Sequence, residues 1–152
     1  MTKADSDPRS RAWALFLSAH AVLLERIEAQ LRRAGLPPLT WYDVLWELEK
    51  ATDGKLRMHE LASRIVLSRS NLTRLADRLE DARLISREEC ADDRRGAYCV
   101  ITSAGRAMRR RMWPAYSAQI EALFAAHVSR EAALQISESL AAVVQAASRT
   151  SA

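Results

Sequence analysis

Five polar side chains between residues 69 and 74 can donate or accept hydrogen bonds, and none of them is acidic. They are Arg69, Ser70, Asn71, Thr73 and Arg74. An arginine presents a planar fork of donors that matches phosphate oxygens and guanine edges, and an asparagine amide matches adenine. A second basic pair, Arg94 and Arg95, follows further along the chain. Residue types in this arrangement favour contact with a nucleic acid.

The cations of the chain are concentrated in its middle. Residues 55–111 hold 14 Lys and Arg residues against eight Asp and Glu residues, which gives +6, so the rest of the chain carries −2 of the total +4. Thirteen of these 14 cations are arginine. A basic centre indicates an anionic partner, although a solvated arginine-rich surface fits the charge equally well.

Length and composition favour one globular domain. The chain has 152 residues, of which 49% are hydrophobic and 28% charged, within the range of ordinary single domains. No apolar run approaches the ~20 residues of a membrane helix, and the first ten residues lack the apolar core of a secretory signal. We therefore expect a cytoplasmic protein.

Chemistry of other kinds has little support in the sequence. The three histidines are far apart, and no paired Cys or His spacing indicates a metal site. No phosphate loop, dinucleotide fingerprint or nucleophile elbow is present. We expect no metal, no cofactor and no catalytic residues. A small helical enzyme is an alternative against which the lack of a catalytic cluster argues.

The spacing of apolar residues predicts a mainly α-helical chain with one β-hairpin. Apolar residues at helical spacing alternate with turn residues over most of the chain, and the period changes to two only near residue 85. The residues expected to cap the first, second, fourth and last helices are Ser10, Thr40, Ser68 and Ser129. The expected helices are 10–33, 41–50, 58–65, 69–82, 103–127 and 130–147, and the expected strands are 84–89 and 97–102, joined by a loop over 90–96.

Two of these helices, 58–65 and 69–82, are joined by a short turn and followed by the basic hairpin, which is the order of a winged helix-turn-helix. A major groove about 12 Å wide admits one helix, whose N-terminal outward residues meet base edges. A narrow hairpin with arginines near its tip can enter the minor groove. The fold class is therefore mainly α (α+β), with a two-stranded wing.

Several motifs in register resemble the MarR family of bacterial transcription regulators. They are Leu67-Ser68-Arg69-Ser70-Asn71-Leu72-Thr73-Arg74-Leu75-Ala76-Asp77-Arg78-Leu79-Glu80, Leu84-Ile85-Ser86-Arg87, Asp93-Arg94-Arg95 and Val100-Ile101-Thr102-Ser103-Ala104-Gly105. The resemblance implies a homodimer that binds a pseudo-palindromic DNA operator, usually as a repressor, and that is often released by a small aromatic ligand. A winged-helix module for protein–protein docking, with DNA binding lost, is the alternative.

The resemblance also implies roles for single residues. Arg95 matches the wing arginine that enters the minor groove, Asp93 matches the acid that orients it, and Arg94 is expected at a phosphate. DNA contacts are implied for Ser68, Ser70, Asn71 and Arg74. Ser68 can also serve as a helix cap, and for Asn71 and Arg74 we favour DNA contact over a solvated helix face. For Asp77, Arg78 and Arg87 we favour an ion-pair network under the wing.

The same resemblance divides the chain into regions of one domain, 1–152. A DNA-binding lobe is expected over about 36–104, and dimerisation helices over about 10–35 and 105–147. The apolar stripes of these dimerisation helices contain more apolar side chains than one small core can bury, so we expect an isologous interface between two copies. The alternative is that these helices only close the core of a monomer.

A ligand pocket is expected between the dimerisation helices and the lobe. Aromatic walls with a few polar tips suit a small aromatic acid. For any one of these side chains, a place in the core or the dimer interface is the simpler interpretation. The candidates are Trp13, His20, Trp41, Tyr42, Trp46, Met112, Trp113 and Tyr116.

The two cysteines, Cys90 and Cys99, flank the wing. If the hairpin turned between Arg94 and Arg95, the two thiols would face each other across the strands, and a disulfide could lock the wing. Reduced thiols are the usual state in a cytoplasmic chain. Oxidant-sensing members of the family carry a cysteine near the start of the first helix, and this chain has none there.

Overall fold

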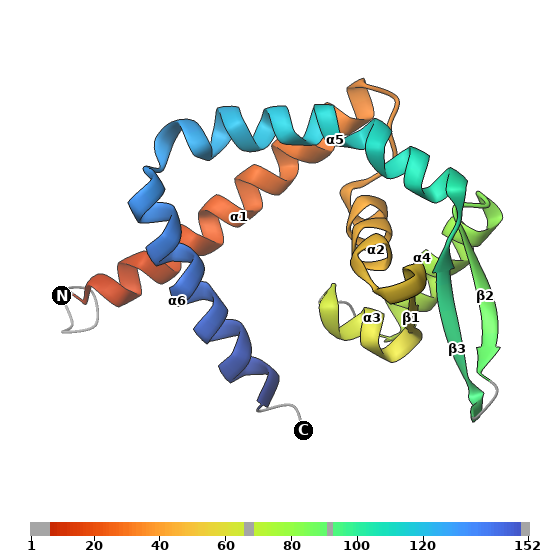
Figure 1. The fold of residues 1–152 in the computed structure, drawn as a ribbon. Helices are drawn as coiled ribbons and strands as arrows, with labels where there is room; N and C mark the ends of the chain where they lie inside the picture. The colour runs from red at the N-terminus through yellow and green to blue at the C-terminus, as the bar shows by residue number, and fades with distance from the viewer. Residues whose placement is uncertain (1–6, 66–68, 91–92, 150–152) are drawn as a thin grey trace. The chain divides into compact units, whose positions relative to one another are not determined.

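The computed structural model describes residues 7–65, 69–90 and 93–149 of the chain. It forms two compact units, Met1–Tyr116 and Ser117–Ala152. The first unit contains the helix-turn-helix and the hairpin, and helix α5 crosses from the first unit into the second (Figure 1). The organisation as one domain stays a prediction.

The elements follow one another in the predicted order. The described residues form helices α1 to α6, the 3-10 turns η1 and η2, and one small sheet of strands β1 to β3. Their bounds are α1 Pro8–Arg33, α2 Leu39–Lys50, η1 Thr52–Gly54, β1 Lys55–Arg57, α3 Met58–Arg64, α4 Arg69–Asp81, β2 Ile85–Cys90, β3 Asp93–Ile101, α5 Ser103–Leu123, η2 Ala125–His127 and α6 Arg130–Arg149.

The first two helices begin at residues other than the expected caps. Asp7 caps α1, because its carboxylate accepts the backbone N–H of Arg9 at 2.9 Å, and a proline at the first helical position needs no such partner. The cap position of α2 is Pro38. Thr40 is therefore inside the first turn of α2, and its prediction as a cap is wrong.

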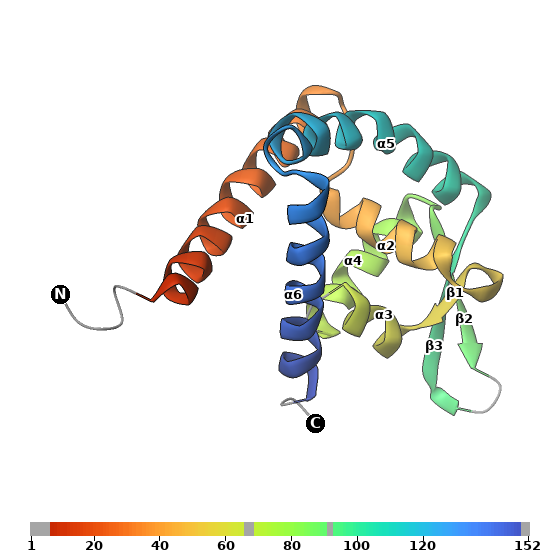
Figure 2. The same ribbon diagram turned by 60° about the vertical axis from the view of Figure 1, so that its left-hand side comes forward.

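The three strands form an antiparallel sheet in the order β1-β3-β2. Strand β3 pairs with β1 through Leu56 and Cys99, and with β2 from Ile85 opposite Ile101 to Cys90 opposite Asp93. The pairing thus extends further towards the tip than expected, and residues 93–96 belong to a strand instead of a loop. The β2–β3 hairpin projects beside the helices of the lobe (Figure 2).

The core of the lobe lies where α2, α3 and α4 pack against the sheet. Its fully buried side chains include Leu45, Leu48, Leu61, Leu72 and Leu79. Gly105 at the start of α5 allows close packing, because a Cβ there would overlap the carbonyl oxygen of Leu84 and crowd Ile101. The helical pattern of leucines thus holds α4 against the sheet, as its spacing predicts.

A second hydrophobic cluster joins α1, α2 and α5 within the first unit. Its buried members are Ile27, Leu31, Leu39, Tyr42 and Met112. At its edge, Glu28 of α1 accepts the backbone N–H of Leu39 at 2.9 Å. The carboxylate thereby satisfies one of the donors that the start of α2 leaves unpaired.

The second unit contains the end of α5, η2 and α6. Ser129 caps α6 as expected, because its hydroxyl accepts the backbone N–H of Ala132 at 3.2 Å. The predicted helix over 103–127 ends earlier, at Leu123, and η2 follows it. Several large apolar side chains of this unit are exposed, including Leu134, Val143 and Val144.

These elements confirm the expected fold class. Helix α3, helix α4 and the β2–β3 hairpin form a winged helix-turn-helix, flanked in sequence by long helices at both ends. In the part of the chain that the structure describes, no helix combines the length and apolarity required to cross a bilayer.

Candidate nucleic-acid interface

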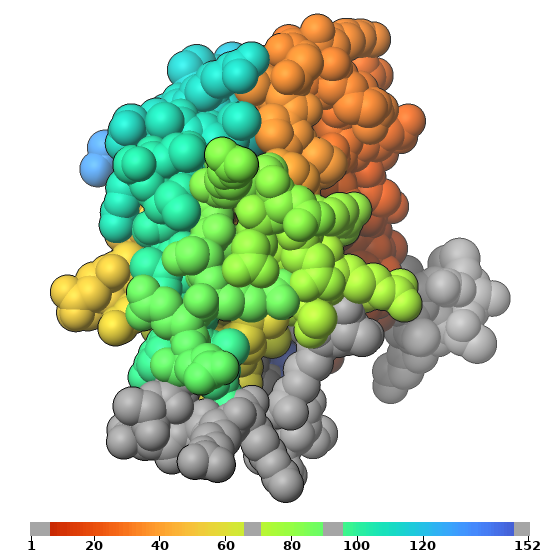
Figure 3. All heavy atoms as spheres, turned by 90° about the vertical axis from the view of Figure 1, so that its right-hand side faces the viewer, coloured from red at the N-terminus to blue at the C-terminus, as the bar shows by residue number. Residues whose placement is uncertain are grey.

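Helix α4 has one buried face and one polar face. Leu72, Leu75, Ala76 and Leu79 point into the core, at the spacing that places side chains on one side of a helix. The residues between them are exposed, so α4 and β2 form the accessible face at the centre of Figure 3. The lobe therefore presents an amphipathic helix with its hydrogen-bonding groups outward.

Three of the predicted DNA-contacting side chains are placed on this outward face. Asn71, Thr73 and Arg74 are exposed on the first turns of α4. Arg69 and Ser70 are the first two residues of the helix and are described by their backbone alone. Ser68 lies outside the described residues. The contacts of all six with DNA stay predictions.

The predicted wing residues begin strand β3. Asp93 is paired with Cys90, and Arg94 and Arg95 follow it along the strand. Their backbones are described and their side chains are not. The hairpin therefore carries both arginines at its outer end, in a strand and not in a loop as expected.

An ion-pair network lies under the wing, as predicted for Asp77 and Arg87. The guanidinium of Arg87 on β2 donates to the Asp77 carboxylate and lies 3.6 Å from Glu80. The Arg87 backbone N–H also donates to Glu80 at 3.2 Å. The hydrogen bond with Asp77 raises the pKa of Arg87 above its ordinary value. These contacts fix the orientation of α4 relative to the hairpin.

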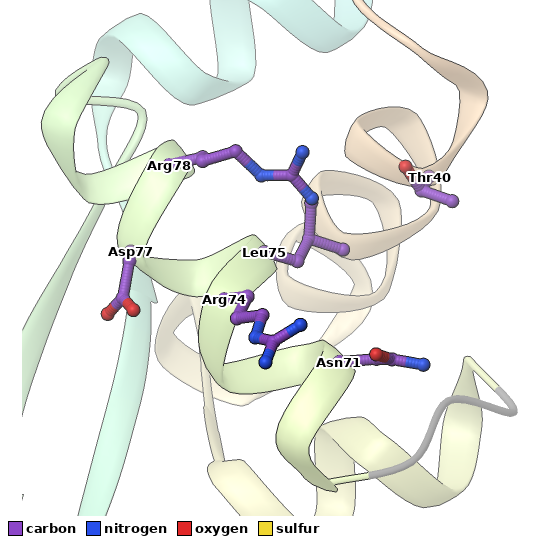
Figure 4. Close-up of a pocket in the computed structure, with 6 residues that line it drawn as sticks. All are labelled: Thr40, Asn71, Arg74, Leu75, Asp77 and Arg78. Carbon is purple, nitrogen blue, oxygen red and sulfur yellow. The ribbon is translucent and has the colours of Figure 1, made fainter.

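Arg78 does not belong to this network, and that part of the prediction is wrong. It lies four residues after Arg74 and therefore on the same face of α4, one turn along. Both side chains face a groove of about 560 Å³ that α4 forms with the start of α2. Figure 4 shows Asp77 on the opposite side of α4 from this groove's two arginines.

The groove contains two residues that sequence analysis missed as site residues. Arg78 has a usable signal, namely its helical spacing from Arg74. Thr40 has none, because only the packing of α2 beside α4 brings it there. The groove is lined by Thr40, Asn71, Arg74, Leu75, Asp77 and Arg78.

Four of the eight candidate ligand-pocket residues come together between α2 and α5. The rings of Tyr42 and Tyr116 have centroids 5.1 Å apart, and Trp113 lies 6.0 Å from each of them. Met112 is buried in the same hydrophobic cluster. Beside the rings, burial raises the pKa of Asp43 to about 6, and the charges of Glu47 and Glu28 add to this effect.

The other four candidates lie elsewhere. Trp13 contacts Phe16 on the exposed first turns of α1, with ring centroids 6.1 Å apart, and His20 is exposed on the same helix. Trp41 packs against the core of the lobe. Trp46 lies under the cations of Lys50 and Arg109, at 5.4 and 5.1 Å from its ring centroid. The eight residues are therefore not gathered into one site.

The prediction that Cys90 and Cys99 face each other across the hairpin is wrong. The register places Cys99 opposite Arg87, and Cys90 opposite Asp93, so the two cysteines do not face each other and the strands do not turn between Arg94 and Arg95. Cys99 is buried, and its thiol lies 3.0 Å from the sulfur of Met58. Burial raises the pKa of Cys99 to about 11. This thiol is a core side chain without the character of a redox sensor.

Comparison with known proteins agrees with this architecture. A family model described as MarR family matches residues 34–96. The transcriptional repressor MprA of Escherichia coli is 31% identical over 100 residues, and the repressor MdtR of Bacillus subtilis is 35% identical over 100 residues. Each match covers 66% of this chain, but only 56% of MprA and 60% of MdtR.

Solved structures match over most of the chain. AbsC, a MarR family transcriptional regulator from Streptomyces coelicolor, has a TM-score of 0.81 and 28% identity, covering 92% of this chain and 94% of its own. Sco3205, a MarR family regulator from the same organism, was solved in complex with DNA. It has a TM-score of 0.85 and 25% identity, and the match covers 96% of this chain and 89% of Sco3205. In sequence, and in the fold with its helix-turn-helix and wing, the chain is similar to regulators of the MarR family.

Proposed function

We propose that the chain is a sequence-specific DNA-binding transcription regulator that acts as a repressor. The observation that carries the proposal is the outward face of α4, where Asn71, Thr73 and Arg74 are exposed at the start of the helix. In a winged helix this part of the second helix of the motif meets base edges in the major groove. The similarity to Sco3205, which was solved with DNA, supports the same use of the fold here.

The regulator acts as a homodimer. One recognition helix reads about half of a site, and two-fold symmetry places two such helices about one DNA turn, ~34 Å, apart. Large apolar side chains are exposed in both units, and a second copy of the chain would cover them. They are Trp13, Leu15, Phe16, Leu17, Val22 and Leu24 in α1, and Phe124, Leu134, Ile136, Val143 and Val144 in the second unit.

A small aromatic ligand releases the protein from its operator. The rings of Tyr42, Trp113 and Tyr116 form an apolar wall with hydroxyl tips, which suits a planar ligand with one or two polar groups. Quenching of Trp113 fluorescence by a panel of phenols and aromatic acids tests this part. Any compound that quenches should also release bound DNA, and binding that leaves DNA affinity unchanged contradicts the regulatory role.

The experiment for DNA binding uses fragments selected by the full-length protein from genomic DNA, including the region upstream of its own gene. Fluorescence anisotropy gives the Kd for a selected duplex and for a duplex of random sequence over a range of salt concentrations. The logarithm of the affinity should fall linearly with the logarithm of the salt concentration. Neither a preference nor a salt dependence on any fragment would contradict the proposal.

Variants of α4 and the wing separate the contributions. Asn71→Ala and Arg74→Ala should each cost ~1–3 kcal/mol on the selected duplex and relax its preference over the random one. Arg95→Ala should weaken binding and lower the salt slope by about one unit. Arg111→Gln on α5 removes the same charge from an exposed position outside the lobe's DNA-facing helix and is the matched control.

A further inference from the structure

We propose that the groove between α2 and α4 binds one phosphodiester group of the DNA backbone through Arg78 and Thr40. This inference rests on the proposed DNA-binding function and assigns different DNA contacts to different residues of α4. Asn71 and Arg74, nearer the start of the helix, contact bases, and Arg78 fixes the position of the helix on the duplex.

Several arginines of the first unit are held by carboxylates, and the two arginines of the groove are not among them. Arg64 and Arg106 lie 3.7 Å from carboxylates of Glu47 and Glu49, and Arg87 and Arg109 are ion-paired more closely. Among the described residues, no carboxylate lies within ion-pair distance of Arg74 or Arg78. Two guanidinium groups on one wall of a groove therefore have their charge available for an anion, and a phosphate accepts their N–H groups in a bidentate manner.

The acid that lines the groove does not cancel this charge. Asp77 points to the other side of α4 (Figure 4), where it accepts a hydrogen bond from Arg87. The network under the wing thereby neutralises Asp77, the one acid that lines the groove among the described residues. The first turn of α2, which contributes Thr40, contains no acidic residue either. The groove is positive on balance because its acid is engaged elsewhere.

Geometry assigns the phosphate to Arg78 and not to Arg74. Four residues along a helix correspond to about 6 Å of rise, so Arg78 lies one turn further from the end that enters the major groove. At that depth a side chain meets the sugar-phosphate edge of the groove and no longer the bases. The Arg78 side chain extends towards α2 (Figure 4), where Thr40 is exposed and can donate its hydroxyl to the same group.

Leu75 forms the floor of the groove and is 2% exposed. The polar side chains that line the groove with it, Thr40, Asn71, Arg74, Asp77 and Arg78, are exposed and accessible to a phosphate. A contact of this kind carries no sequence information and sets the register of the protein on DNA. The groove should therefore raise affinity for every duplex by the same factor.

The test compares Arg78→Gln and Thr40→Ala with Arg111→Gln, using the selected and the random duplex. Arg78→Gln should weaken both complexes by about tenfold or more, as for loss of a charged hydrogen bond, and should lower the salt slope by about 0.9. The ratio of the two affinities should not change. Thr40→Ala should weaken both complexes less and leave the slope unchanged, and Arg111→Gln should resemble the wild type.

A second measurement locates the phosphate. Single methylphosphonate substitutions remove one backbone charge at a time from the selected duplex. For the wild type, one position in each half-site should weaken binding in a way that Arg78→Gln no longer shows. Thermal unfolding midpoints equal to that of the wild type establish that the variants are folded.

Two results overturn the inference while the proposed function stands. The first is an Arg78→Gln variant with the salt slope and affinity of the wild type. The second is a variant that loses the preference for the selected duplex, because Arg78 would then read a base. If the wild-type protein binds no duplex in a salt-dependent manner, that result contradicts the proposed function itself.

Discussion

The two halves of helix α1 carry similar apolar side chains in different surroundings. In the C-terminal half, Ile27 and Leu31 are buried against residues of α2 and α5, and Leu31 is 1% exposed. In the N-terminal half, Trp13 and Leu17 are 57% and 47% exposed. The contrast shows that a helical stripe defines a face of the helix but not the partner that covers it. In our proposal, the chain itself covers one half and a second copy covers the other.

The largest effect should come from the buried half. Leu31→Ala leaves a cavity between α1 and its neighbours, so we expect the free energy of unfolding to fall by ~2–5 kcal/mol in urea titrations. Leu31→Met, which conserves volume, is the control and should cost less than ~1.5 kcal/mol. Equal losses for the two variants would mean that packing at Leu31 does not hold this half of the helix.

Substitution of Asp43, which lies beside the same cluster, should raise the free energy of unfolding at neutral pH instead of lowering it. Its pKa of about 6 in the folded protein lies above the value of about 3.9 in an unfolded chain. Folding therefore favours the protonated carboxyl, and the stability present at low pH is lost as the pH rises from about 4 through 6.

We accordingly expect Asp43→Asn to be more stable than the wild type at pH 7.5 by ~1–2 kcal/mol, allowing for water around the half-buried group. The difference should shrink towards pH 4. Urea titrations at several pH values measure it, and a difference that grows on acidification would contradict the assigned cause.

A smaller loss should follow removal of the contact between α1 and the start of α2. Glu28→Ala leaves the backbone N–H of Leu39 without its acceptor, which should cost ~1 kcal/mol. Glu28→Gln keeps an acceptor oxygen and lowers the negative charge near Asp43, so it should cost less than Glu28→Ala. If the two variants unfold at the same urea concentration, the hydrogen bond does not contribute.

The smallest effect on the isolated chain should come from the exposed half. Leu17→Ala repeats the chemistry of Leu31→Ala where the side chain has no cover, so dilute protein should lose less than ~0.5 kcal/mol. At higher concentration the loss should grow, because a dimer is stabilised by mass action and Leu17 lies in its proposed interface. Sedimentation equilibrium should show weaker association. A loss that does not depend on concentration would contradict the dimer face.

Much of the fold could be predicted because it depends on local patterns. The leucines of α4 and the alternation in β2 and β3 specify which face of each element is buried. The hairpin turn was harder to place, since Asp93 and Gly96 resemble loop residues and only the pairing of Cys90 with Asp93 draws them into the strand. For the same reason, counting positions from an assumed turn gave the wrong partner for Cys99.

The part of the site that lies on one helix could be predicted from the sequence. Asn71, Thr73 and Arg74 follow from helical spacing after the turn of the motif. The different roles of Asp77 and Arg78 do not, because Arg87 on another element takes one of them and the groove beside α2 receives the other. Thr40 joins the groove only through tertiary packing, which no local pattern of the sequence records.

The rate at which the buried thiol of Cys99 is alkylated can measure how often the lobe opens. It lies against Met58 at the junction of β1, β3 and α3, and its raised pKa keeps it protonated at neutral pH. An alkylating reagent can reach it only after the sheet separates from the helix, so the labelling rate in a Cys90→Ser background reports how often that separation occurs. The same rate, followed with and without DNA, would reveal whether the operator holds the winged helix closed.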